Sequence, residues 1–179
     1  NELLAEVVTE KESKNLPIKF EIKEDTEIDI QIDKENSVAL CLEANNPEKD
    51  LPMDIATELI QKLNEDKKTL YLLGSGESAS DYANNLRLND CAFVDLTNKT
   101  NFSQLAKILT MVKGLISIDT GTMHMATAVG CPVLGIFLKP HTTNMWAPIK
   151  ELYISNVIEN DITAENIINK FYNLVNING

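Results

Sequence analysis

Residues 115–137, LISIDTGTMHMATAVGCPVLGIF, contain two apolar runs on either side of a short segment whose polar residues gather at its front end. The first run is rich in β-branched residues, which favours a strand, and Asp119, Thr120 and Gly121 supply a turn at the expected start of a helix. Gly130 suits the left-handed conformation that ends a helix, and the proline two residues later cannot continue it. The stretch therefore predicts a strand, a helix and a second strand, with the helix N-terminus where open α/β sheets bind anionic ligands.

Alternating apolar runs and helical patterns extend this βαβ unit over most of the chain. The apolar runs predict strands at residues 38–42, 70–73, 91–94, 115–118, 133–137 and 152–154. Apolar residues at helical spacing predict helices at residues 55–63, 80–88, 102–112, 123–129 and 164–175, the first one started by Pro52. Such alternation with short connections is typical of a mainly parallel sheet covered on both faces. We therefore expect an α/β, Rossmann-like, doubly wound domain over residues 37–179.

Residues 1–36 have a different pattern. Apolar residues at helical spacing among acidic neighbours predict a short amphipathic helix over residues 1–14. Strict alternation follows at Ile18, Phe20, Ile22, Ile28, Ile30 and Ile32. The alternation is interrupted by a charged segment, so it predicts two half-buried strands in a hairpin. We expect residues 1–36 to form a linker or accessory arm beside the domain.

The composition argues against several classes of function. With 16 Lys+Arg against 27 Asp+Glu the formal charge is -11, which opposes general nucleic-acid binding, so any phosphate ligand must be met locally. No run approaches the roughly 20 apolar residues of a membrane span, and no cationic-then-apolar signal peptide opens the sequence. The start without Met indicates a fragment or a processed product, and 179 residues are too few for two nucleotide-binding domains.

The cysteines and carboxylates do not predict a metal site. Cys41, Cys91 and Cys131 lie in or beside apolar runs without a pair spacing, which predicts buried free thiols in a reducing compartment. The sequence has no Cys-x-x-Cys, no cysteine with a histidine at metal-ligand spacing, and no Asp-x-Asp that would hold a divalent cation. We therefore expect no metal cofactor.

Three groups of polar residues follow predicted strands, where a doubly wound fold collects its ligand-binding groups. Lys49 could meet a phosphate or be a solvated loop residue. The glycines of residues 74–78, GSGES, allow close backbone approach, and Glu77 could accept hydrogen bonds from a ribose or be a favourable acid in a first helical turn. Asp119 could bind a ligand or cap the helix, and His124 could donate to a ligand or pack.

Residues 119–133, DTGTMHMATAVGCPV, resemble the signature of glycosyltransferase family 9, the lipopolysaccharide heptosyltransferases. That signature is Asp-Ser/Thr-Gly-x-x-His-x-x-x-Ala-x-x-x-Pro, followed by a strand that ends in Phe. Lys49 and Pro52 are similar to a Lys-x-x-Pro of the family, Glu77 resembles its glycine-flanked acidic residue, and residues 146–148, WAP, resemble a segment near its last active-site loop. The resemblance covers residues 37–150 and implies the C-terminal, donor-binding half of a two-domain GT-B fold, with the arm as the interdomain connection.

The resemblance also implies roles for individual residues. Thr120 and Gly121 would offer hydroxyl or backbone groups to the donor diphosphate, and Asp119 and His124 would lie beside the sugar and the phosphates. By the same resemblance, the acidic residue at position 77 would hold the ribose, and the lysine at position 49 would neutralise the leaving group.

The activity implied is that of an inverting glycosyltransferase, which moves a sugar from a nucleotide diphosphate sugar to lipopolysaccharide or another cell-surface glycan. The family's general base and acceptor site belong to an N-terminal domain, so we expect this chain alone to bind the donor and not to transfer sugar. The resemblance implies a cytoplasmic enzyme without a metal or other cofactor, which could associate peripherally with the inner face of the cell membrane.

Two alternatives stay open. Residues 43–46, EANN, and 138–141, LKPH, depart from the family pattern, and these loops favour a non-catalytic nucleotide-binding or assembly module with the same fold. Residues 118–122, IDTGT, also resemble the aspartic protease loop. That fold is all-β and needs a second aspartate from another lobe or subunit, whereas a helical pattern follows directly here, so the short motif lacks its structural context.

Overall fold

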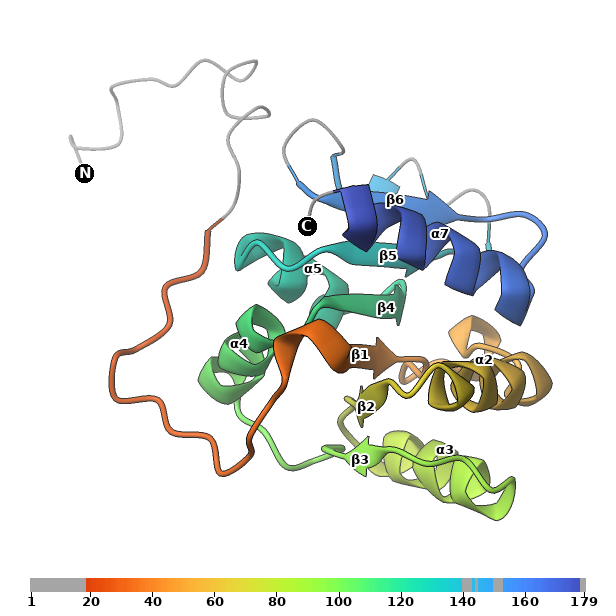
Figure 1. Ribbon diagram of the computed structural model, residues 1–179, viewed down its shortest axis with the longest axis horizontal. Helices are drawn as coiled ribbons and strands as arrows, with labels where there is room; N and C mark the ends of the chain where they lie inside the picture. The colour runs from red at the N-terminus through yellow and green to blue at the C-terminus, as the bar shows by residue number, and fades with distance from the viewer. Residues whose placement is uncertain (1–18, 140–142, 144, 150–152, 178–179) are drawn as a thin grey trace.

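The computed structural model describes residues 19–139, 143, 145–149 and 153–177. Within these ranges a six-stranded parallel sheet has the order β3-β2-β1-β4-β5-β6 (Figure 1). The strands are β1 (Ser37–Cys41), β2 (Thr69–Leu72), β3 (Val94–Asp95), β4 (Gly114–Ile118), β5 (Val133–Ile136) and β6 (Ser155–Ile158). The helices are α2 (Met53–Glu65), α3 (Glu77–Leu88), α4 (Phe102–Met111), α5 (Gly121–Ala128) and α7 (Ala164–Ile177), with short 3₁₀ helices η1 (Lys34–Asn36) and η2 (Pro47–Lys49). The predicted doubly wound α/β fold is confirmed.

The sheet reverses its winding direction between β1 and β4. From β1 the chain moves outward through β2 to β3, then returns to place β4 on the other side of β1 and continues outward to β6. In the register, Cys41 at the end of β1 lies opposite Ser117 of β4. The loops that follow β1 and β4 diverge from this point, and doubly wound folds bind ligands in the resulting crevice.

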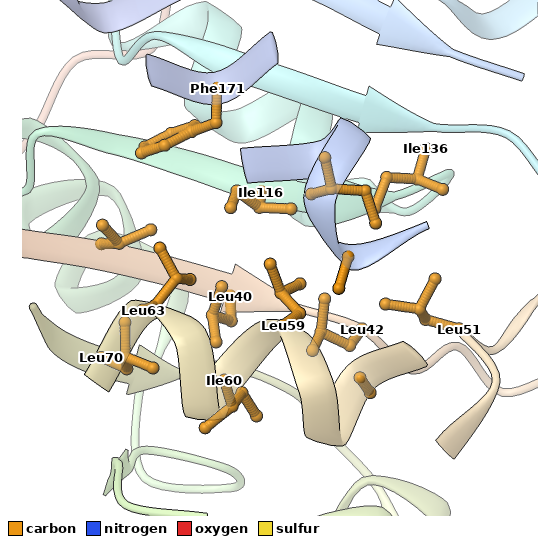
Figure 2. Packing of buried hydrophobic residues seen from close by; sticks show 14 of the residues in the cluster. Leu40, Leu42, Leu51, Leu59, Ile60, Leu63, Leu70, Ile116, Ile136 and Phe171 are labelled. Carbon is orange, nitrogen blue, oxygen red and sulfur yellow. The ribbon is translucent and has the colours of Figure 1, made fainter. Parts of the chain in front are cut away.

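Helices cover both faces of the sheet (Figure 1). Side chains of a strand alternate between the faces, so Leu40 packs in the core with α2, α3 and α7, whereas Ala39 packs in the core with α4 and α5. Figure 2 shows Leu59 and Leu63 of α2 beside Leu40 in the first of these layers. Because these leucines have no exposed surface, truncating one to alanine should cost about 2–5 kcal/mol.

The end of α5 follows the sequence prediction. Gly130 has a φ of 76°, the left-handed conformation expected of it. Its amide donates to the carbonyl of Thr127, and the amide of Cys131 donates to that of Ala126, so these bonds close the helix before β5.

The predicted hairpin is wrong. Residues 19–33 contain no strand, and Ile18 and the predicted helix over residues 1–14 lie outside the described residues. The segment 19–33 runs instead as an extended arm beside α4 (Figure 1). The amide of Phe20 donates to the carbonyl of Ala128 at 3.1 Å, and the Gln104 side chain donates to the carbonyl of Glu27 at 3.1 Å.

The alternation of apolar residues in this arm does match the pattern of burial in the structure. Ile28, Ile30 and Ile32 are partly buried against the core on the α4 and α5 side, and the residues between them are exposed. An extended segment that rests on helices shows one row of side chains to the core without pairing with a second strand. Period-two alternation therefore detected the extended backbone but not its partner.

The two edge strands lie later in the chain than predicted. The amide of Cys91 donates to the carbonyl of Leu86 and so still belongs to the turn that ends α3, which delays β3 to Val94–Asp95. Residue 152 of the predicted last strand lies outside the described residues, and residues 153–154 are not in a strand. The last strand is Ser155–Ile158, because the polar pair Ser155 and Asn156 takes part in the ladder with β5.

Candidate functional site

A cavity of about 810 Å³ lies at the carboxyl ends of β1, β2 and β4. This volume is within the range of about 300–1,000 Å³ typical of small-molecule sites. Its polar lining comes from the loop after β1, the glycine-rich loop after β2, the loop before α4 and the start of α5. The cavity therefore occupies the crevice that the strand order predicts.

Lys49 and Asp119 meet in this cavity. The Nζ of Lys49 lies 2.9 Å from the Oδ2 of Asp119, and both residues line the cavity. Lys49 ends η2, which is capped by the side chain of Asn46, and Asp119 directly follows β4. Asp119 is thus an ion-pair partner, and the N-cap position of α5 belongs to Thr120.

The start of α5 presents open backbone groups to the cavity. Thr120 makes no side-chain cap hydrogen bond, and its Oγ1 lies 3.1 Å from the Oγ of Ser117 and 3.5 Å from the Sγ of Cys41. The amides of a helix's first turn lack the usual i−4 acceptor. In α5 the amide of Met123 donates to the carbonyl of Thr120 at 3.1 Å, whereas the amides of Gly121 and Thr122 have no acceptor among the described residues. A Cβ on Gly121 would meet no atom within 4 Å, so the backbone here is accessible from the cavity that Gly121 lines.

Two of the predicted site residues do not line the cavity. Glu77 is the first residue of α3 and is exposed. His124 is exposed on α5, where its ring makes an edge contact with that of Trp146 at a centroid separation of 6.3 Å. Their assigned roles therefore stay predictions, whereas Lys49, Asp119 and the first residues of α5 are brought together as expected.

Glu43 lines the cavity, although no sequence motif assigns it a role. The residue is only 7% exposed, and one of its carboxylate oxygens accepts a hydrogen bond from the Ser78 hydroxyl at 2.5 Å. Burial raises the pKa of Glu43, while the hydrogen bond from Ser78 opposes this rise. The position of Glu43 in the sequence could have predicted its place in the cavity, because an acidic residue that follows a buried strand lies at the carboxyl edge of the sheet.

The glycine-rich loop after β2 is held by Asn98. The amide of Gly76 donates to the Asn98 Oδ1 at 2.7 Å, and the Asn98 Nδ2 donates back to the Gly76 carbonyl at 3.0 Å. Gly76 has a φ of 99°, which favours glycine, and Asn98 itself has a φ of 57°. Asn98 thus fixes the glycine-rich wall of the cavity, although it lies outside the glycine-rich motif and could not be assigned this role from the sequence.

The loop before α4 forms another wall of the cavity. Asn101 caps α4 in a reciprocal pair with Gln104, and Phe102 is 76% exposed at the cavity rim. The strand and helix pattern predicted α4 but not that its first residues reach the site.

The three cysteines are buried and free, as predicted. Over the described part of the chain, no three His, Cys, Asp or Glu residues gather in a way that could hold a metal ion. Among the same residues, no helix is long and apolar enough to cross a membrane.

Comparison with solved structures finds the same fold in glycosyltransferases. The glycosyl transferase family 9 protein of Veillonella parvula DSM 2008 has a TM-score of 0.69 at 15% identity, over 79% of this chain and 46% of that one. E. coli heptosyltransferase WaaC with ADP has a TM-score of 0.67 at 17% identity, over 78% and 44%. The E. coli ADP-heptose lps heptosyltransferase II has a TM-score of 0.62 at 18% identity, over 79% and 47%.

The chain thus spans less than half the length of these solved proteins, and the likeness shows the fold, one half of a GT-B glycosyltransferase. The comparison with curated proteins finds no match. The sequence model described as "Glycosyltransferase family 9 (heptosyltransferase)" matches residues 2–170. The chain therefore belongs to glycosyltransferase family 9, the heptosyltransferase family.

Proposed function

We propose that this chain is the donor-binding half of an inverting, heptosyltransferase-like glycosyltransferase and that its cavity binds a nucleotide diphosphate sugar. Family membership supports the class of reaction. The observation that carries the proposal is the ion pair of Lys49 and Asp119 beside the open N-terminus of α5. A cation and unpaired amides on one wall of a cavity are the groups that bind a diphosphate.

The proposed chemistry places these groups at the leaving group. An acceptor hydroxyl loses its proton to a general base and attacks the anomeric carbon of the donor. The bond from that carbon to the diphosphate oxygen breaks, its electron pair stays on the diphosphate, and the configuration at the carbon inverts. Lys49 and the first amides of α5 would stabilise the negative charge that grows on the diphosphate as the bond breaks.

The general base and the acceptor site are proposed to lie in an N-terminal half of a longer protein. The solved relatives support this division, because the chain matches 44–47% of their length. We propose lipopolysaccharide or another cell-surface glycan as the acceptor, and a cytoplasmic location that includes the inner face of the cell membrane. One of the solved relatives is an lps heptosyltransferase, which supports this class of acceptor.

Calorimetric titration of the 179-residue chain with ADP and UDP tests the donor-binding proposal. We expect one of the diphosphates to bind at least tenfold more tightly than the matching nucleoside, because the diphosphate contacts carry the affinity. EDTA should leave that affinity unchanged, because the leaving-group charge is assigned to Lys49 and the α5 amides. Equal affinity for diphosphate and nucleoside, or no binding of either diphosphate, would contradict the proposal.

A second candidate is a non-catalytic nucleotide-binding module. It is favoured by Glu43, which places a buried carboxylate in the cavity where the family pattern expects small residues. Donor turnover by the longer protein with a glycan acceptor separates the two candidates. Nucleotide binding without turnover would favour the module, and release of the nucleotide with sugar transfer would favour the enzyme.

A further inference from the structure

We propose that Gln104 is a positioning residue, which couples nucleotide binding in the cavity to docking of the arm, residues 19–33, on α4 and α5. This inference rests on the proposed function, because it needs a nucleotide in the cavity. Gln104 itself does not line that cavity, so it would act through its neighbours. A change in the arm would then alter nucleotide affinity, and a bound nucleotide would hold the arm in place.

The side-chain amide of Gln104 makes a hydrogen bond with each of its ends. Its Oε1 accepts from the backbone amide of Asn101 at 3.0 Å, and its Nε2 donates to the carbonyl of Glu27 in the arm at 3.1 Å. Both contacts fix which end is oxygen, because a backbone amide only donates and a carbonyl only accepts. Since Asn101 lines the cavity, one planar group joins the arm to a cavity wall.

The arm is packed unevenly along its length. The isoleucines of residues 28–32 are partly buried against the core. Residues 23–27 instead line a second cavity of about 530 Å³, together with residues 101–104 at the start of α4. Here Gln104 and Lys107 hold the arm by hydrogen bonds to its carbonyl groups. Segments with few buried apolar contacts open at a low cost in free energy, so this part of the arm can release while residues 28–32 stay docked.

Asn101 and Phe102 form a wall between the two cavities, because both residues line each of them. Phe102 is 76% exposed, so its position depends on the helix start rather than on packing. Release of the arm removes a fixed contact from that helix start and leaves the wall less ordered. A nucleotide that needs the ordered wall binds more tightly when the arm is docked, and the effect of docking on binding is reciprocal.

The backbone amide of Phe20 measures whether the arm is docked. It donates to the carbonyl of Ala128, the last residue of α5, at 3.1 Å. An amide in such a contact exchanges with solvent when the local structure opens. Its exchange rate therefore follows release of the arm, and a nucleotide coupled to docking should slow it.

Gln104→Glu separates the two hydrogen bonds of this side chain. Glutamate at the third helical position keeps the acceptor of the capping box, but it has no donor for the Glu27 carbonyl. Ser103→Asp is the matched control, because it adds the same charge in the same turn, where an acid suits the helix dipole, and leaves Gln104 in place. Ser103 lines the second cavity but not the first. Thermal unfolding of each variant verifies that it is folded.

ADP and UDP are titrated by calorimetry into the 179-residue chain and both variants, and amide exchange is followed by NMR. In the unmodified chain, the preferred nucleotide at saturation should slow exchange of the Phe20 amide by about threefold to tenfold, within the range for one hydrogen bond. Gln104→Glu should weaken nucleotide binding by a similar factor, and in this variant the nucleotide should change Phe20 exchange by less than about 1.5-fold.

Ser103→Asp should bind the nucleotide within about twofold of the unmodified chain and should keep the slower exchange at Phe20. If Gln104→Glu does not fold, Gln104→Met also lacks the donor and should show the same loss of coupling.

Three results would overturn the inference. Nucleotide affinity of Gln104→Glu within about twofold of the unmodified chain would show that the arm contact does not support binding. Slower Phe20 exchange that persists in this variant would show that the coupling does not pass through Gln104. An equal loss of affinity in Ser103→Asp would assign the effect to the added charge. In these cases the unmodified chain still binds the nucleotide and the proposed function stands, whereas no binding of ADP or UDP by the unmodified chain rejects both proposals.

Discussion

The Nζ of Lys49 lies 2.9 Å from the Oδ2 of Asp119, and this contact joins the loop after β1 to the loop after β4. The two residues are 70 positions apart in the sequence. They meet because β1 and β4 are neighbours in the sheet and both end at the same edge. The contact therefore holds a cation at the switch point, beside the start of α5.

The two halves of this ion pair should contribute unequally to stability. The Asp119 side chain is 11% exposed and that of Lys49 is 34% exposed. Lys49→Ala leaves a largely buried carboxylate without its partner, which should cost about 1–3 kcal/mol. Asp119→Ala should cost less than about 1 kcal/mol, because the flexible lysine can extend into water. Urea unfolding of both variants measures the difference, and a larger loss for Asp119→Ala would contradict this account of the pair.

A side chain at position 121 should block ligand binding without unfolding the protein. The structure leaves space around a Cβ at Gly121, so Gly121→Val should fold but fill the approach to the α5 amides. We expect a melting temperature within a few degrees of the unmodified chain and loss of ADP and UDP binding by calorimetry. Nucleotide affinity that survives this substitution would remove the α5 amides from the site.

A matched glycine in the same cavity should behave in the opposite way. A Cβ on Gly74 would lie 2.8 Å from the Cβ of Ala79, closer than two carbon atoms can approach. Gly74→Ala should therefore destabilise the chain by about 1–3 kcal/mol, as overpacked substitutions do. An unchanged melting temperature for Gly74→Ala would contradict this packing.

The stability penalty at Glu43 should depend on pH. Burial raises the pKa of this carboxyl above its ordinary value, so the folded state holds the proton more tightly than the unfolded state. Below the unfolded pKa both states are protonated and no penalty exists. As the pH rises through the folded pKa, the carboxylate forms in a desolvated position and stability falls.

Glu43→Gln should therefore raise the melting temperature at pH 7–8 and have little effect near pH 4, where the carboxyl is largely protonated. Melting curves of both proteins across this range provide the measurement. A gain that is constant with pH, or that is largest in acid, would show that desolvation does not control this group.

Asn98 should determine the conformation of the glycine-rich loop. Its side chain exchanges two hydrogen bonds with the backbone of Gly76, and its own φ is positive. Asn98→Ala loses the bonds and strains the backbone, with an expected cost of about 1–3 kcal/mol. Asn98→Gly loses the same bonds without the strain and should cost less. Amide hydrogen exchange at Gly76 should accelerate in both variants, and protection that persists would contradict the role of Asn98.

The sequence was sufficient to locate the strands that are fully buried. β1, β4 and β5 are buried along their whole length, and their apolar runs located them to within about one residue. The edge strands were misplaced because neither β3 nor β6 is buried along its whole length, and β6 contains polar residues. The arm over residues 19–33 was wrongly predicted to be a hairpin. Alternation of apolar residues indicates which side chains face the core, but it does not indicate whether the segment packs on helices or pairs with a strand.

Residues of the candidate site could be predicted from the sequence when they follow the end of a predicted strand. Lys49, Asp119 and Gly121 line one cavity for this reason. The partner of Asp119 could not be predicted, because a lysine 70 residues away is joined to it only through the strand order. Side-chain direction was also inaccessible, and it separates Glu43, which lines the cavity, from Glu77, which does not.

The central claim is that a nucleotide diphosphate binds to the start of α5, and the amide NMR spectrum of the isotope-labelled chain tests it most directly. Titration with ADP or UDP should shift the amide signals of Gly121 and Thr122 more than those of α2 or α7, which lie away from the cavity lining. The same titration of Lys49→Ala should require a higher nucleotide concentration. Shifts that spare the start of α5, or a spectrum that no nucleotide changes, would contradict the account.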